Sequence, residues 1–227
     1  MVCKTIYSGS NPLGTSTFLS GMTNFNTTGV KIPSVFYQSD DVVSLARELL
    51  GKKVCTSLEG EFTSAIITET EAYRSWGDKA CHASGNKRTP RTEVMFGPGG
   101  NSYVYLCYGI HHLFNIVVNQ KERAEAILIR AVEPIDGVDI MEARRRKKRS
   151  NPMITSGPGN VSQALGITTT LNAVDLAGDQ IWLEDCGLKP TEIVATTRIG
   201  VDYAGEDAQH PWRFYLKDSP HVSRRCS

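Results

Sequence analysis

The sequence predicts an α+β fold in which an antiparallel sheet supplies much of the core. Between residues 103 and 130, apolar and polar residues alternate with the period of two that half-buried strands show. Stripes of apolar residues at helical spacing are short and few. They do not alternate with the strands in the regular order of a parallel βαβ sheet. We therefore expect one mixed domain with antiparallel strands.

The first helix is predicted directly after an acidic cluster. Ser39, Asp40 and Asp41 supply an N-cap and negative charge for the first turn, and Gly51 ends the helix. The apolar residues between these signals follow helical spacing: Val42, Leu45, Ala46, Leu49 and Leu50. This pattern indicates one short amphipathic helix.

Strands follow the helix and dominate the middle of the chain. Residues 54–58 and 62–70 are predicted to form a hairpin that turns at Glu59-Gly60. The segment 74–100 has the composition of a loop. After it come the expected strands 103–107, 113–119 and 126–130, a helix from about Gly137, a helix over 161–165, and strands near 181–184 and 193–199.

Composition indicates one globular domain with an extension. The chain has 227 residues, of which 40% are hydrophobic and 22% are charged, and its net charge is +1. Any nucleic-acid surface must therefore come from where the basic residues lie. Residues 1–32 are rich in Ser, Thr, Asn and Gly, so we expect a poorly ordered N-terminal extension before a domain over residues 33–227. The sequence has neither a signal-peptide core nor an apolar run of membrane-spanning length, which favours an intracellular protein.

The cysteines give no sign of a metal or redox site. The six are Cys3, Cys55, Cys81, Cys107, Cys186 and Cys226, and no two of them form a CxxC pair. The acidic residues and histidines also lack the spacing of metal ligands. We expect reduced thiols, no metal and no cofactor.

Two acids precede a long and unusual loop. Glu69 and Glu71 lie two residues apart at the expected end of a strand, so their side chains share a face unless the strand ends between them. A solvated strand end is the common meaning of such a pair. The following loop, however, carries His82 and several cations, including Arg91, and is too long for a mere linker. A general base at this place is therefore a serious alternative.

An aromatic residue lies at the turn after a strand. The stretch NSYVYLCYGI places Tyr108 directly before Gly109, where a bulky ring gains little from packing in the core. An exposed ring that stacks on a partner or inserts between bases is at least as plausible as a bland surface position. Further on, Asn115 is a polar residue within an apolar run. Arg130 ends a second apolar run, and if its guanidinium is buried it needs a carboxylate or a phosphate as partner.

Seven blocks of the sequence resemble one enzyme family. The blocks are TETEAY, ACHA, RTPRTEVMFGPGG, YVYLCYGIHHLFNIVV, ILIRAVEP, SGPGNVSQALGI and RIGVDYAGEDAQHPWRFYL, and they extend from about residue 33 to 223. In order and spacing they are similar to the alkyladenine (3-methyladenine) DNA glycosylases, the monofunctional base-excision class. The resemblance implies a single mixed domain with a curved antiparallel sheet and a protruding β-hairpin.

The resemblance also implies the chemistry of the site. Glu71 matches the general base that deprotonates the water attacking C1′ of a flipped nucleotide. Arg130 and the backbone carbonyl of Val201 match the groups that hold this water. Tyr108 matches the residue that fills the gap left in the duplex, because flipping a nucleotide costs a few kcal/mol of stacking.

The remaining site residues are implied in the same way. Tyr73, His82 and Tyr105 match the aromatic walls of the base pocket, which would favour a cationic base such as 3-methyladenine. The backbone amide of His82 would donate to the edge of hypoxanthine or ethenoadenine. Asn115 matches the side chain that crowds the exocyclic amine of guanine, and Arg91 and Met95 match contacts to the DNA backbone. Double-stranded DNA with damaged purines is thus the expected partner of a monomer.

Two features depart from or stand outside this resemblance. Asn160 occupies a position where the family commonly has lysine, so about one phosphate contact and about one unit of salt slope are expected to be lost. The basic run 144–149 could contact phosphates, but a solvated helix end is the more frequent meaning of such a run. No lysine is placed as a Schiff-base nucleophile, which predicts no strand-nicking lyase step.

Two other functions remain possible at the level of sequence. The first is a module that binds damaged DNA on the same scaffold without turnover, which the retained Glu71 and Arg130 disfavour. The second is a hydrolase of free nucleosides, which would need neither an exposed Tyr108 nor basic segments. Turnover of a free nucleoside compared with a duplex carrying the same lesion separates them.

Overall fold

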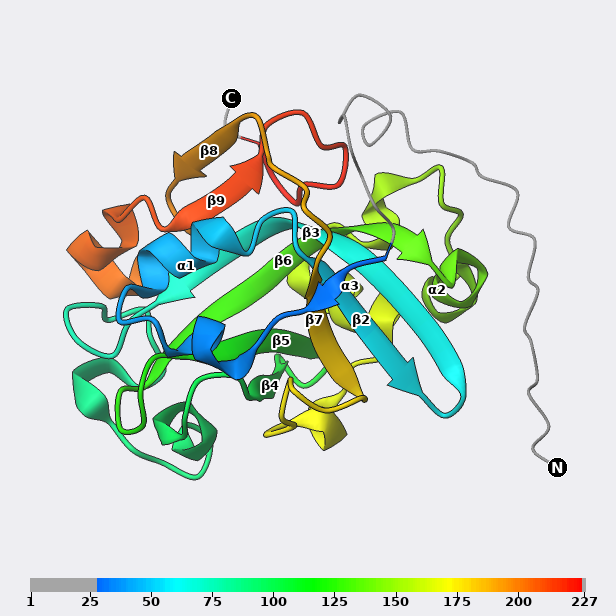
Figure 1. Ribbon diagram of the computed structural model, residues 1–227. Helices are drawn as coiled ribbons and strands as arrows, with labels where there is room; N and C mark the ends of the chain where they lie inside the picture. Colours follow the sequence, from blue (N-terminus) through cyan, green and yellow to red (C-terminus); the bar gives the residue numbers. More distant parts are fainter. Residues whose placement is uncertain (1–27, 226–227) are drawn as a thin grey trace, which may run out of the picture.

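A computed structural model describes residues 28–225, which form one mixed α+β domain around an antiparallel sheet (Figure 1). The strands are β1 (Val30–Lys31), β2 (Lys53–Leu58), β3 (Glu61–Tyr73), β4 (Ser102–Cys107), β5 (His111–Val118), β6 (Glu125–Asp136), β7 (Ile181–Asp185), β8 (Ile193–Thr196) and β9 (Arg213–Leu216). The α-helices are α1 (Val42–Glu48), α2 (Val138–Arg145) and α3 (Pro158–Leu165). The predicted fold class is confirmed.

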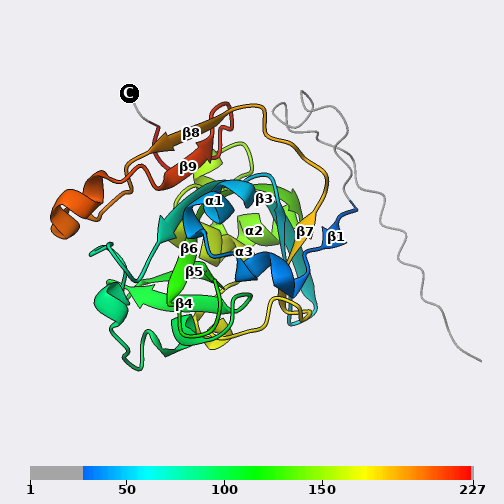
Figure 2. The ribbon, with the colours of Figure 1, turned by 60° about the vertical axis from the view of Figure 1, so that its left-hand side comes forward.

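The sheet runs in the order β1-β7-β2-β3-β6-β5-β4, and β9 pairs with both β3 and β8. The long strand β3 is central: its first half pairs with β2, and its residues 69–71 pair with β9. The other edge of β3 pairs with β6 along most of its length. In both views the β8–β9 pair lies at the top of the molecule and β4, the last strand of the order, lies in its lower half (Figure 2).

The expected elements occur with small changes in their bounds. Asp41 caps α1, since its carboxylate accepts hydrogen bonds from the backbone of Val43 and Ser44, both at 3.0 Å. The turn between β2 and β3 has positive φ at Glu59 and Gly60, which suits a tight hairpin. The helix α3 begins at Pro158, three residues earlier than expected, because proline is favoured at the first helical position. Two short 3₁₀ turns, Ser84–Asn86 and Glu93–Phe96, interrupt the expected loop 74–100.

Two predictions need correction. The strand β3 continues to Tyr73, so Glu69 and Glu71 lie inside a strand rather than at its solvated end, and both are fully buried. At the N-terminus, residues 1–27 of the expected extension lie outside the described residues. Val30–Lys31 nevertheless forms an edge strand that pairs with β7, and Ile32 is buried, so the ordered domain begins before residue 33.

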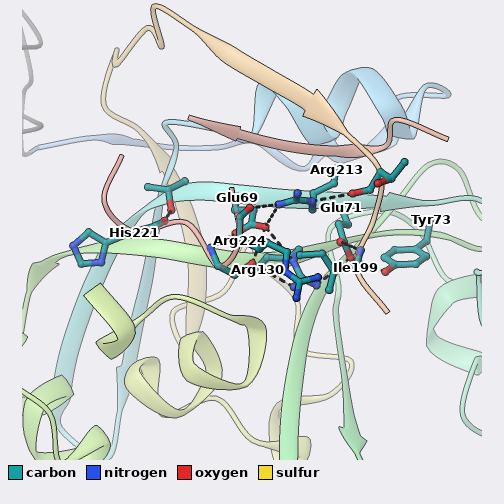
Figure 3. A network of polar contacts seen from close by, with 11 residues as sticks. Glu69, Glu71, Tyr73, Arg130, Ile199, Arg213, His221 and Arg224 are labelled. Atoms are coloured by element: carbon teal, nitrogen blue, oxygen red, sulfur yellow. Dashed lines mark hydrogen bonds and ion pairs between the residues drawn. The ribbon is translucent and has the colours of Figure 1, made fainter. Parts of the chain in front are cut away.

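The helix α1 lies in front of the sheet in Figure 1, and this placement fixes which way the two acids point. Thr70 of β3 donates a hydrogen bond of 2.7 Å to the carbonyl oxygen of Ala46 in α1. Successive side chains of a strand point to opposite faces. Glu69 and Glu71, on either side of Thr70, therefore point away from α1 and toward the face where Arg130 lies (Figure 3).

Candidate active site

The Glu71 carboxylate has three hydrogen-bond donors around it (Figure 3). Its Oε1 accepts from the backbone N–H of Ile199 at 2.8 Å. Its Oε2 accepts from the Tyr73 hydroxyl at 2.7 Å and from Nη1 of Arg130 at 3.2 Å. These donors come from β3, β6 and the segment after β8, so three parts of the chain hold one carboxylate in place.

A local irregularity of the sheet aims Arg130 at this carboxylate. Glu69 pairs with Ala131 and Thr70 pairs with Ile129, so Arg130 is an extra residue on β6 at that step. A bulge of this kind bends a strand and re-aims its side chain. The guanidinium is only 7% exposed and forms ion pairs with both Glu69 and Glu71 at 3.2 Å. The anion expected for Arg130 is thus a pair of carboxylates.

The charge states around Glu71 follow from burial. Burial, and then the neighbouring Glu71, raise the pKa of Tyr73 well above its usual value, so its phenol stays protonated and donates. Burial alone would lower the pKa of Arg130, but Glu71 and Glu69 outweigh it and the pKa is raised. Arg130 therefore remains a cation.

A cavity of about 440 Å³ opens beside these groups, within the range of ligand pockets. Tyr73, Arg130 and Ile199, which all bond to Glu71, line it. The other lining residues used below are His82, Arg91, Met95, Tyr103, Tyr105, Tyr108, Asn115 and Val201. The structure thus brings the base candidate and the expected pocket residues to one place.

Aromatic rings form one side of the cavity. The His82 and Tyr105 rings meet edge to face with centroids 4.7 Å apart, and Nδ1 of His82 lies 2.9 Å from the Tyr103 hydroxyl. Burial, and then the charge of Arg91, lower the pKa of His82 to about 4. The imidazole is therefore neutral at pH 7, so His82 adds no positive charge that would repel a cationic base.

Asn115 is a satisfied buried amide that also lines the cavity. Its side-chain nitrogen donates to the carbonyl oxygens of Tyr103 at 3.0 Å and Leu113 at 3.2 Å, and the residue is 3% exposed. Both amide hydrogens are used in this way. The side-chain oxygen is the acceptor left for a molecule in the cavity.

Val201 is buried and lines the cavity. Its carbonyl oxygen accepts a hydrogen bond of 2.9 Å from the N–H of Ala204. A carbonyl oxygen has two lone pairs. One acceptor direction of Val201 is therefore left over.

The residues expected to touch DNA differ in exposure. Tyr108 is 92% exposed at the tip of the β4–β5 hairpin, and the guanidinium of exposed Arg91 lies 4.6 Å from the Tyr105 ring centroid. Met95, by contrast, is 1% exposed and packs in a buried cluster with Cys81 and Phe96. Met95 also lines the cavity, and its expected contact with the DNA backbone stays a prediction.

The turn at the hairpin tip is strained. Tyr108 and Gly109 have φ of 51° and 73°, and Ile110 donates to the carbonyl of Cys107 at 3.1 Å. Positive φ is rare for a bulky residue. An aromatic side chain kept in such a backbone, with almost all of its surface in solvent, indicates a function for the ring rather than a packing role.

Two cations of the basic run 144–149 have local partners. Arg144 pairs with Glu61 at 2.7 Å and also donates to the carbonyl of Ala164, while Arg145 donates to the carbonyl of Ile154 at 2.9 Å. The first two members of the basic run therefore fasten α2 to its neighbours. Asn160 donates to the carbonyl of Ser156 at 2.6 Å at the start of α3.

Other residues of the site could not be assigned from the sequence. Arg198 forms a bidentate ion pair with Asp78. Arg213 and Ser223 both contact Glu69. Each pairing joins residues more than 100 positions apart. The only signal in the sequence was a charged residue at the end of an apolar strand. Such a signal does not identify the residue with which the charge pairs.

Within residues 28–225, no group of three or more His, Cys, Asp or Glu side chains could hold a metal ion. Cys55, Cys81, Cys107 and Cys186 are free thiols. None of the described helices is both long and apolar enough to cross a membrane.

Comparison with known proteins shows a consistent family. The family model described as "Methylpurine-DNA glycosylase (MPG)" matches residues 35–220. Curated relatives named "Putative 3-methyladenine DNA glycosylase" include one from Desulfitobacterium hafniense, 45% identical over 83% of this chain and 96% of its own length. Another from Methanocella arvoryzae is 47% identical over 86% of this chain and 96% of its own length. One from Chlamydia felis is 46% identical over 82% of this chain and 95% of its own length.

Proposed function

The chain belongs to the methylpurine-DNA glycosylase family, and from that premise we propose that it removes alkylated and deaminated purines from duplex DNA with Glu71 as general base. A member of this family is a DNA glycosylase: it hydrolyses N-glycosyl bonds and so begins base excision repair. The lesions we assign to it are 3-methyladenine, hypoxanthine and ethenoadenine. The first of these is supported by the names of the relatives.

The hydrogen bonding of Glu71 is the observation that carries the proposal. A carboxylate offers about four acceptor positions. Tyr73 and Arg130 occupy both positions of Oε2, and Ile199 occupies one of Oε1. The remaining position of Oε1 can accept a hydrogen from a water at the edge of the cavity. As this water attacks C1′ of the flipped nucleotide, its proton passes to Glu71 and the purine leaves with the electrons of the N-glycosyl bond.

Two further groups suit the attacking water. Arg130 lines the cavity with a guanidinium nitrogen 3.2 Å from Glu71, and the Val201 carbonyl has an acceptor direction left. In our assignment they hold the water between them. The buried Glu71 carboxylate also stabilises the positive charge that develops on the sugar.

The cavity suits a flat purine, including a cationic one. Tyr73, His82 and Tyr105 supply ring surfaces, and the low pKa of His82 keeps its imidazole neutral. We assign to the His82 amide a hydrogen bond to the edge of the lesion. Asn115 would exclude guanine by crowding its exocyclic amine.

The substrate is DNA rather than a free nucleoside, and Tyr108 supports this choice. An exposed aromatic side chain at a hairpin tip can replace the stacking lost when a nucleotide leaves the duplex. We assign a phosphate contact to Arg91, which is exposed and lines the cavity. We propose that one copy of the chain acts alone, inside the cell, where damaged DNA is found.

We also assign a monofunctional reaction, without strand cleavage. A lyase step needs an amine that attacks C1′ and forms a Schiff base. No lysine lines the cavity in the described part of the chain. Water is then the nucleophile, and the product is an abasic site in an intact strand.

Single-turnover release of hypoxanthine from a duplex with one deoxyinosine tests the proposal. The parent protein is compared with Glu71→Gln, and strand breaks are scored before and after alkali. We expect base release by the parent, loss of release in the variant, and breaks only after alkali. A parallel assay uses 3-methyladenine in a duplex and free deoxyinosine in solution.

Each alternative function predicts a different result. A parent that binds both damaged duplexes and releases no base would be a damage-binding module. Equal turnover of free deoxyinosine and the duplex would indicate a nucleoside hydrolase. Breaks before alkali, with a protein–DNA adduct trapped by borohydride, would contradict the monofunctional assignment.

A further inference from the structure

A second buried carboxylate lies behind the Glu71 site, and the proposed reaction does not use it. Glu69 is fully buried, and its Oε1 accepts hydrogen bonds from Nε of Arg130 at 3.2 Å and from Nη1 of Arg213 at 2.9 Å. Arg213 is itself 2% exposed. Burying a charge is costly unless the charge is paired, so a buried cluster of two carboxylates and two guanidiniums needs all four members.

The segment after β9 completes this cluster (Figure 3). Ser223 donates to Glu69 twice, from its backbone N–H to Oε2 at 2.6 Å and from its hydroxyl to Oε1 at 2.8 Å. The same hydroxyl accepts a hydrogen bond of 3.3 Å from Nη2 of Arg130. Ser223 therefore joins the two buried residues through one oxygen atom.

Other contacts fasten this segment to the sheet. The Thr68 hydroxyl donates to the carbonyl of His221, and Nδ1 of His221 lies 3.0 Å from the Thr155 hydroxyl. Arg213 donates to the carbonyl of Arg224 at 2.7 Å. Ser223 is thus held on both sides, and its hydroxyl is fixed relative to β3 and β6.

We propose that Glu69 and Ser223 are positioning residues for catalysis, which act through Arg130 on the water at Glu71. This assignment rests on the proposed function. Neither residue lines the cavity or contacts Glu71; each instead bonds Arg130, so we assign neither a contact with substrate. Their effect is to fix the plane and rotation of the guanidinium.

The geometry of the guanidinium explains why both are needed. Each of the three nitrogens of Arg130 has one partner: Nε bonds Glu69, Nη1 bonds Glu71 and Nη2 bonds Ser223. Without Glu69 and Ser223, the Arg130 side chain can turn about its long axis while it still pairs with Glu71. A displacement of about 1 Å at a catalytic group can cost about 100-fold in rate.

The test compares four proteins in the single-turnover assay: the parent, Ser223→Ala, Ser223→Thr and Ser219→Ala. Ser219 is the matched control, because it lies in the same segment and its buried hydroxyl accepts from the N–H of His221 at 3.2 Å without contacting Glu69 or Arg130. Affinity for the deoxyinosine duplex and the side-chain ¹⁵Nε–Hε signal of Arg130 are measured on each protein. Glu69→Gln is a fifth variant.

We expect base release by Ser223→Ala to slow by about 10- to 100-fold, the range for a hydrogen bond to a charged group. Ser223→Thr should restore most of the rate, and Ser219→Ala should match the parent. Affinity for the duplex should stay within about twofold, because no phosphate contact changes. The Arg130 Nε–H should exchange with solvent faster in Ser223→Ala and Glu69→Gln than in the parent.

The contrary outcomes are distinct. An unchanged rate and an unchanged Arg130 signal in Ser223→Ala would overturn the inference. So would an equal loss in Ser219→Ala, which would show that any weakening of the segment has the same effect. If Glu69→Gln does not fold, the rates and Arg130 signals of the two Ser223 variants test the inference. A parent that releases no base would defeat the proposed function, and the Arg130 signal would still report whether Ser223 orients that side chain.

Discussion

Arg198 and Asp78 form an ion pair through both guanidinium prongs, at 2.6 and 2.7 Å, and both side chains are completely buried. Arg198 immediately precedes Ile199, whose N–H bonds Glu71. Its guanidinium also lies 4.9 Å from the Tyr73 ring centroid. The pair thus holds two of the three groups that contact the Glu71 carboxylate.

Removing one partner of this pair should destabilise the fold. Asp78→Asn leaves a buried guanidinium without its anion, and we expect the free energy of unfolding to fall by about 3–5 kcal/mol. Urea denaturation monitored by circular dichroism measures the change. Glu192→Gln, at the exposed pair with Lys217, is the control and should leave the free energy of unfolding nearly unchanged. Similar small losses in both variants would contradict the importance of burial.

Tyr73→Phe should slow base release without unfolding the protein. The variant keeps the ring but removes the hydroxyl that donates to Glu71 at 2.7 Å. A hydrogen bond to a charged group contributes about 1.5–3 kcal/mol, so the single-turnover rate should fall by about 10- to 100-fold. Binding of the lesion duplex, measured by fluorescence anisotropy, should be nearly unchanged. A large loss of affinity with a normal rate would mean that the hydroxyl serves base binding instead.

Tyr108→Ala should impair nucleotide flipping and leave stability intact. The ring is 92% exposed, so its removal costs little packing, and the melting temperature should not fall. Stacking in the gap is worth about 1–3 kcal/mol, which predicts about 10- to 100-fold slower excision from duplex DNA. Tyr108→Phe, which keeps the ring, should behave like the parent. The idea fails if both variants excise hypoxanthine at the parental rate.

The protein should lose stability as the pH falls from about 7 to 5. Burial lowers the pKa of both His82 and His221 to about 4, below the unfolded value near 6.5. Between these values the unfolded chain binds more protons than the folded one, so stability is present above about pH 6.5 and is lost toward pH 4. We expect a loss of about 1–2 kcal/mol per histidine at pH 5. Urea midpoints for the parent and His221→Gln check this, since the variant should show the weaker dependence on pH.

Asn160→Lys should strengthen DNA binding in a salt-dependent way. The new cation at the start of α3 would add about one phosphate contact, raising the slope of log affinity against log salt by about one unit. The single-turnover rate at saturating protein should not change, because Asn160 is not among the residues that line the cavity. Affinities at four salt concentrations give the slope. An unchanged slope would show that position 160 lies away from the phosphates.

The sequence predicted the elements well and their long-range pairing poorly. Alternation of apolar residues located β4, β5 and β6, and capping residues located α1, because both signals are local. The burial of Glu69 was not predictable, since it depends on Arg130, Arg213 and Ser223, which lie 61, 144 and 154 positions away. The bulge that aims Arg130 depends on the register between β3 and β6, which no single strand encodes.

The candidate site was predicted through resemblance rather than through spacing. The resemblance named Glu71, Arg130, Tyr73, His82, Tyr105, Asn115 and Val201, and the structure gathers them at or beside one cavity. Their assigned roles remain predictions. A position in a motif does not reveal how far its side chain is buried, and Met95, matched to a contact with the DNA backbone, is 1% exposed.

The bonds of Ser223 also set an order for the assembly of this region during synthesis. The strands β3 and β6 leave the ribosome before the segment that carries Ser223, so they can pair while Glu69 still lacks two of its hydrogen bonds. A nascent chain that stops short of residue 223 can contain every residue of the cavity and still leave one nitrogen of Arg130 without its serine partner. The network around Glu69 therefore closes only after residue 223 has been made.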